Sequence, residues 1–92
     1  MKRKKIKSLG NKIESLRGQG GIKSKELESI AKSLGRIRHK RGKHTTWISP
    51  IFPDLRPISI QHHSKDPNRH VANNILNQLE IDLTRFEEIC ED

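Results

Sequence analysis

Aromatic residues, cysteines and long hydrophobic runs are all scarce in this chain of 92 residues. Hydrophobic residues make up 30% of the sequence, and the only aromatic residues are Trp47, Phe52 and Phe86, so we expect one small domain with a modest core. Cys90 is the single cysteine, which excludes an intramolecular disulfide and favours a reducing compartment. No run of about 18 apolar residues and no signal-peptide core occurs, so the sequence predicts a cytoplasmic protein without a membrane segment.

Acidic residues are scarce in the first half of the chain. Residues 1–43 hold 15 Lys and Arg against 3 Asp and Glu, a net charge of +12, whereas residues 44–92 carry −4, which together give the overall +8. Such a polarised charge favours a polyanionic partner, either a nucleic acid or an acidic protein. A solvated surface that serves only solubility is the alternative interpretation.

The N-terminal segment lacks the pattern of a packed domain. Residues 1–21 begin with a basic arm and end in the glycine-rich stretch 18–21, which is typical of a flexible break. A few apolar residues in between have helical spacing, but Gly10 disfavours a helix there. We therefore expect residues 1–21 to form a basic flexible extension, with at most one short helix, and residues 22–92 to form the domain.

Two segments of the domain have helical periodicity. Apolar residues recur at the i, i+3, i+4, i+7 spacing in residues 24–34 and again in residues 69–79. Ser24 is the expected cap of the first helix, and residues 66–68 offer a cap for the second. Asp82 is expected to cap a final short helix.

Between these helices the pattern changes to alternation. Residues 36–41, 44–49 and 56–61 read as three short antiparallel strands joined in a meander. The order helix, three strands, helix predicts an α+β fold, in which a small three-stranded antiparallel sheet carries two helices on one face.

His44 lies directly after a strongly basic run. An imidazole can exchange a proton near neutral pH, and cations beside it would hold a phosphate backbone, so this arrangement suits RNA cleavage. His44 is the candidate general base, and His63, or less directly His62, is the candidate proton donor. The candidate phosphate-binding residues are Arg36, Arg38, Lys40, Arg41 and Lys43. For each of these residues, a solvated surface position without function is the alternative.

Trp47 and the remaining histidines allow further interpretations. Trp47 could stack on a nucleic-acid base, but strand alternation puts it on the opposite face from His44, which favours packing in the core. The spacings of the five histidines and Cys90 match no zinc pattern, so we expect no metal ion and no small-molecule cofactor.

Three short segments occur in a characteristic order. They are Gly42-Lys43-His44, the strand-end segment 58–63 that closes on His62 and His63, and residues 71–82, which contain Ile75-Leu76-Asn77-Gln78-Leu79-Glu80-Ile81. Over about residues 22–88 they resemble the HicA family of toxin–antitoxin ribonucleases. That family has Gly-Ser-His with a catalytic third residue, Val-Pro-x-His at the end of the last strand, and Ile-Leu-x-Gln-Leu-Gly-Ile in the closing helix. Here Lys43 replaces the Ser, Gln61 replaces the Pro, and Glu80 replaces the Gly.

The resemblance implies a fold like that of a double-stranded RNA-binding domain, with the order α-β-β-β-α. It also implies a metal-independent endoribonuclease that cleaves mRNA and inhibits translation, with His44 as the catalytic residue. The implied partner is an acidic antitoxin of the HicB type that neutralises the toxin.

A non-catalytic RNA-binding module of the same fold is the alternative. Such a module would bind duplex RNA through phosphate and 2′-hydroxyl contacts. It normally holds phosphates at a Lys-rich start of its second helix, where this chain offers only Arg69 and His70. The cations of this chain lie on the first strand instead.

Overall fold

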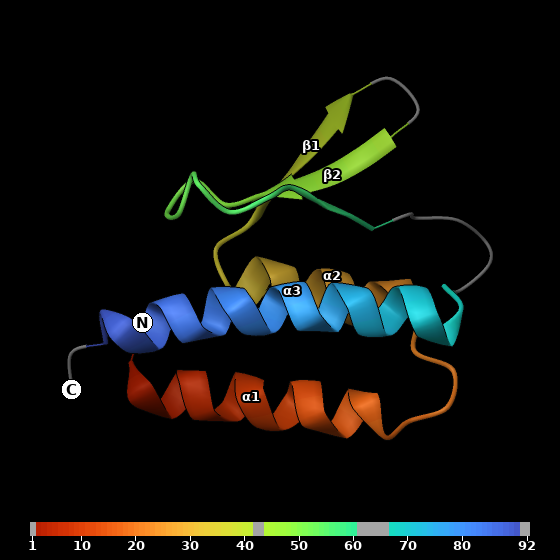
Figure 1. Cartoon of the computed structure of the whole chain (residues 1–92), viewed down its shortest axis with the longest axis horizontal. Coiled ribbons are helices and arrows are strands. Elements are labelled where there is room, and N and C mark those ends of the chain that lie inside the picture. Colours follow the sequence, from red (N-terminus) through yellow and green to blue (C-terminus); the bar gives the residue numbers. More distant parts are fainter. Residues whose placement is uncertain (1, 42–43, 61–66, 91–92) are drawn as a thin grey trace.

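The computed structural model describes residues 2–41, 44–60 and 67–90, and of Lys40, Arg41 and His44 it describes the backbone alone. The elements, in chain order, are α1 (Arg3–Arg17), α2 (Ser24–Ser33), β1 (Ile37–Arg41), β2 (His44–Ile48), β3 (Ile58–Ser59) and α3 (Arg69–Glu88) (Figure 1).

The three strands form one antiparallel sheet in the order β1-β2-β3. β1 and β2 make a hairpin whose register pairs Ile37 with Ile48 at one end and Arg41 with His44 at the other. β3 pairs with the other side of β2 and is only two residues long. The α+β class and the three-stranded antiparallel sheet expected from the alternating pattern are therefore confirmed.

The helices stack in layers next to the sheet. In Figure 1, α2 and α3 lie between the sheet and α1. Two helices thus precede the sheet, and the element order differs from the predicted order of one helix, three strands and one helix. A single apolar cluster joins the layers, with Ile13 from α1, Leu27 from α2, Trp47 from β2 and Leu79 from α3.

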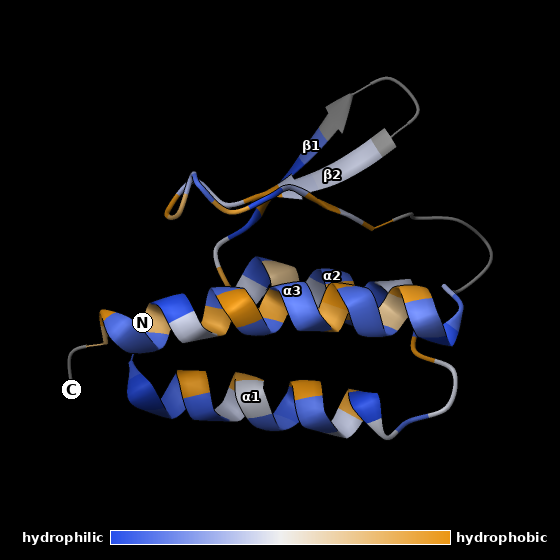
Figure 2. Cartoon of the chain, in the orientation of Figure 1, coloured by the Kyte–Doolittle hydropathy of each residue, from blue (hydrophilic) through white to orange (hydrophobic). Residues whose placement is uncertain are grey.

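Within residues 1–21, where we expected a flexible extension with at most one short helix, the structure has a helix that packs against the rest of the chain. Residues 3–17 are the helix α1, which buries Ile6, Leu9, Ile13 and Leu16. Figure 2 shows the hydrophobic positions of α1 on the side that faces α3. Burying one such side chain is worth about 1.5–3 kcal/mol, whereas a glycine inside a helix costs about 1 kcal/mol, so packing outweighs the effect of Gly10.

The predicted C-terminal short helix is also wrong, because α3 is one helix from Arg69 to Glu88. Its cap lies within the predicted segment 66–68 and is Asn68, whose Oδ1 accepts a hydrogen bond from the Val71 N–H at 2.8 Å. Asp82 is not a cap but a buried residue in the helix interior. None of the helices that the structure describes is long and apolar enough to cross a bilayer.

The second helix begins and ends close to the predicted residues. α2 starts at Ser24, but its cap is Lys23, whose backbone N–H donates to the Glu26 carboxylate at 3.3 Å. Gly35 follows the helix with φ +81°, a left-handed conformation that favours glycine. This turn directs the chain from α2 into the first strand of the sheet.

Candidate nucleic-acid interface

The β1–β2 hairpin brings the candidate general base into register with a candidate phosphate ligand. His44 begins β2, Arg41 ends β1, and their Cα atoms are antiparallel partners. Partners of this kind have Cα atoms about 4.5–5.5 Å apart. Lys40 precedes Arg41 on the same strand, whereas Lys43, His62 and His63 lie outside the described residues.

The middle of β1 is open to solvent. Arg38 and His39 are both exposed, and the Thr46 hydroxyl donates a hydrogen bond across the hairpin to the His39 carbonyl at 3.2 Å. Within the described part of the chain Arg38 makes no ion pair, so its guanidinium is accessible to a phosphate. Arg38 therefore keeps the role that the sequence assigned to it as a candidate.

Arg36 does not keep that role. Its side chain is 1% exposed, and it forms a two-pronged pair with Asp82, with Nε to Oδ2 at 2.6 Å and Nη2 to Oδ1 at 2.8 Å. Nη1 donates to the backbone carbonyls of Trp47 at 2.7 Å and Arg56 at 3.1 Å. The expectation that Arg36 binds phosphate is thus corrected, because its donors are already used inside the protein.

The Arg36–Asp82 pair holds the elements under the exposed strand surface together. It connects the start of β1 to α3, to β2 and to the segment before β3. The sequence held one signal for it, since Asp82 falls on the apolar stripe of α3 that also contains Leu79, Leu83 and Phe86. A charged residue at such a position needs a buried partner, because an isolated charge in the core is costly.

Trp47 belongs to the core, as strand alternation predicted. Its side chain is 1% exposed, so it offers no face for stacking on a base. The Lys32 ammonium of α2 lies 6.0 Å from the centre of its ring, which is the outer limit of a cation–π contact. The buried ring anchors β2 to the helices, and His44 begins the same strand three residues before it.

The described part of the chain has open clefts beside the helices. One, of about 320 Å³, lies between α3 and the segment before β3 and includes Asp54, Arg56 and Ile81. At its rim Arg85 donates to both Asp54 oxygens, at 2.6 and 3.1 Å. This hydrogen bonding lowers the pKa of Asp54 below its ordinary 3.8 and raises the pKa of Arg85.

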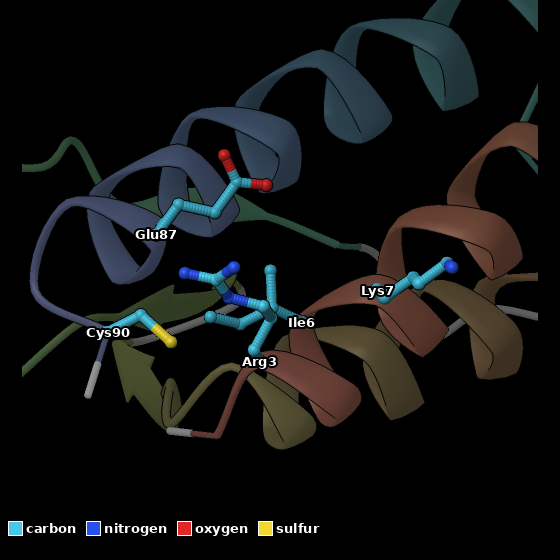
Figure 3. A pocket seen from close by; sticks show the side chains of 5 residues that line it. All are labelled: Arg3, Ile6, Lys7, Glu87 and Cys90. Carbon is cyan, nitrogen blue, oxygen red and sulfur yellow. The ribbon is translucent and has the colours of Figure 1, made fainter. Parts of the chain in front are cut away.

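A second cleft, of about 410 Å³, is shown in Figure 3. It lies between the start of α1 and the end of α3 and is lined by Arg3, Ile6, Lys7, Glu87 and Cys90. Neither cleft is lined by residues 37–48. Where the structure describes its side chains, the candidate site is the exposed surface of β1 with Arg38 and His39, and charged side chains on an exposed strand suit contact with a phosphate backbone.

A second basic surface lies on α1, where the sequence predicted a basic arm without fixed structure. Lys2, Lys4, Lys5, Lys7 and Lys12 are all exposed on or beside α1. Helical spacing of the apolar residues was the available signal, but the glycines at positions 10, 18, 20 and 21 argued against a docked helix. The lysines became a defined surface only because α1 packs against α3.

The described residues hold no group of three or more His, Cys, Asp or Glu side chains placed to bind a metal ion. Comparison of the chain with protein-family models, with curated proteins and with solved structures finds no match.

Proposed function

We propose that this chain is an endoribonuclease toxin of the HicA type, which cleaves mRNA without a metal ion and so inhibits translation. One observation carries the proposal: the register of the hairpin sets His44 beside Arg41 at the end of a basic strand. The order of the short motifs along the chain supports the same assignment.

The chemistry needs a base, an electrostatic hold on phosphorus and a proton for the leaving group. RNA supplies its own nucleophile in the 2′-hydroxyl, from which the His44 imidazole removes the proton. The new bond from this oxygen to phosphorus breaks the bond to the 5′-oxygen, which takes a proton from the candidate donor His63. Positive side chains nearby offset the charge that develops on the phosphoryl oxygens.

The phosphate ligands in this proposal are Arg38, Lys40, Arg41 and Lys43. Arg38 is exposed and without an ion pair in the described part of the chain. The others lie at or next to the hairpin end, within the same basic run of the sequence. Arg36 positions this strand from inside the protein and is no longer among the ligands.

An acidic antitoxin of the HicB type is the proposed protein partner. The overall charge of +8, concentrated before residue 44, supplies the attraction. Covering β1 and the hairpin end would keep RNA away from His44 and so neutralise the toxin.

The decisive experiment compares His44→Ala with the native protein on a purified mRNA in the presence of EDTA. Loss of the base is expected to slow cleavage by about 10²–10⁴-fold and to abolish growth arrest in cells. His39→Ala is the matched control, because His39 is an exposed histidine on the neighbouring strand and has no assigned role. RNA with a 2′-deoxy group at the cleavage position is expected to stay intact, since it lacks the nucleophile.

The alternative function is a non-catalytic RNA-binding module. At the start of α3 this module would have only the exposed Arg69 and His70 for phosphate contact, in place of a lysine-rich helix start. In a gel assay with duplex RNA this alternative predicts a shifted but intact duplex with every variant. Cleavage by His44→Ala at the native rate would contradict the proposed mechanism.

A further inference from the structure

The exposed side of α1 carries an unbalanced positive charge. Residues 2–13 contain six Lys and Arg residues and no Asp or Glu. Of these, Lys4, Lys5 and Lys12 are exposed and make no ion pair within the part of the chain that the structure describes. We call these three residues the α1 lysine surface.

The acidic residues near α1 form no ion pairs with the α1 lysine surface in the described part of the chain. Glu14 and Glu80 both face Arg17, at 3.6 and 2.9 Å. Glu87 lies in the cleft at the start of α1, and in Figure 3 the Lys7 side chain extends away from it. The lysines therefore present their full charge to solvent.

The packing of α1 gives these lysines a fixed arrangement. Residues 4, 8 and 12 are spaced at i, i+4 and i+8, so they lie along one side of the helix, and residue 5 is next to them. Lys5 and Lys12 are two turns apart, about 10 Å along the axis. The buried stripe of Ile6, Leu9, Ile13 and Leu16 prevents the helix from turning this side away from solvent.

We propose that the α1 lysine surface is a second RNA-binding site, which contacts the phosphate backbone without reading sequence. The proposal takes RNA as its ligand from the proposed function but does not require cleavage. Figure 1 places α1 on the far side of α2 and α3 from the sheet, so this site is separate from the hairpin. A long RNA that touches both sites would bind more tightly than either site alone allows.

The chemistry of the surface favours RNA over a protein or a membrane. The apolar side chains of α1, Ile6, Leu9, Ile13 and Leu16, are buried, so the helix offers none of the apolar anchors on which protein interfaces depend. A membrane-bound helix inserts its apolar face into the lipid, but that face of α1 is packed on α3. Lysines without aromatic neighbours are typical of contacts with a phosphate backbone.

The test measures the salt dependence of RNA binding by the full chain, with His44→Ala added to every protein to prevent cleavage. The probe is a single-stranded RNA of about 30 nucleotides, and binding is followed by fluorescence anisotropy from 50 to 200 mM salt. The slope of log Kobs against log salt is negative, and in the variant K4Q/K5Q/K12Q its magnitude is expected to fall by about 2. Each lost phosphate contact with a single strand removes about 0.7 from that magnitude. The affinity of this variant is expected to fall by about 10-fold or more at 0.1 M salt.

Two variants control for charge and for folding. K23Q/K25Q/K32Q removes three exposed positive charges from α2 and its cap, and its slope is expected to stay near that of the parent. K4R/K5R/K12R keeps the charge and is expected to retain the parent slope. Gln, Arg and Lys have similar helix propensities, and circular dichroism checks that α1 is retained.

Equal slopes for the two Gln variants would overturn the proposal, since the effect would then be one of net charge alone. The proposal would also be overturned, in favour of a membrane surface, if K4Q/K5Q/K12Q lost the parent's binding to vesicles of phosphatidylcholine and phosphatidylserine but bound RNA like the parent. Failure of cleavage by the native protein would instead contradict the proposed function and leave these slopes as an independent result.

Discussion

At the scale of the residue, the pair of Arg36 and Asp82 places two charges where neither meets solvent. Each side chain is 1% exposed, and removing either ion from water costs several kcal/mol. The cost is offset because the carboxylate accepts two hydrogen bonds from Arg36, and the Nη1 group of Arg36 donates to two backbone carbonyls. The pair thus holds β1, β2 and α3 in one arrangement.

Asp82→Asn is expected to lower the free energy of unfolding by about 3–5 kcal/mol, because it leaves the Arg36 charge buried without a counter-charge. Urea denaturation of the purified variant measures this loss. The matched control is Glu80→Gln, the same acid-to-amide change two residues away on α3. Its partner Arg17 is 25% exposed, so the control is expected to cost less than about 1 kcal/mol. Equal losses in the two variants would show that burial of the pair is not what matters.

At the scale of the element, α1 and α3 approach closely at a glycine. A Cβ placed on Gly10 would lie 3.4 Å from the Leu83 Cδ2 atom, which is an ordinary van der Waals contact. The glycine is therefore not needed for close packing, and it lowers the intrinsic stability of α1. By contrast, a Cβ on Gly35 would meet the Ile51 Cδ1 atom at 2.8 Å, in a backbone conformation with φ +81°.

Gly10→Ala is expected to raise the free energy of unfolding by about 0.5–1 kcal/mol, because alanine is the better helix former. Gly35→Ala serves as the opposite case and is expected to lower it by about 1 kcal/mol or more, since alanine is strained at positive φ. Both values follow from chemical denaturation. A destabilised Gly10→Ala protein would mean that α1 and α3 cannot accommodate one further methyl group.

At the scale of the whole molecule, one core includes α1 rather than ending at α2. The apolar cluster runs from Ile6 in α1 to Phe86 near the end of α3 and includes Trp47 of the sheet. A small domain with one continuous core unfolds in a single cooperative step.

We therefore expect the fluorescence of Trp47, the only tryptophan, and the helical circular dichroism at 222 nm to change at the same urea concentration. Trp47 reports on the sheet, whereas the dichroism reports largely on the three helices. Helical signal lost well before the tryptophan signal would indicate that α1 is only loosely attached.

The position of the hairpin was predictable from the sequence, but which of its cations lie in solvent was not. The basic run, His44 and the hairpin that pairs Arg41 with His44 were all readable from alternation and turn residues. The position of Asp82 on an apolar stripe signals that it needs a buried partner, but the sequence does not show that this partner is Arg36, which lies 46 residues away. The number of cations along a strand does not determine which of their side chains are exposed to solvent.

Local pattern alone determined the helix at 24–33, the three strands, the Asn68 cap and the burial of Trp47, because periodicity and capping act between residues close in the chain. Only the tertiary structure decided that α1 docks and that α3 continues through Asp82. A short amphipathic helix with an internal glycine is marginal by itself, and a buried aspartate is tolerated only beside its arginine. Both outcomes depend on contacts between distant segments, which exist only once the chain has folded.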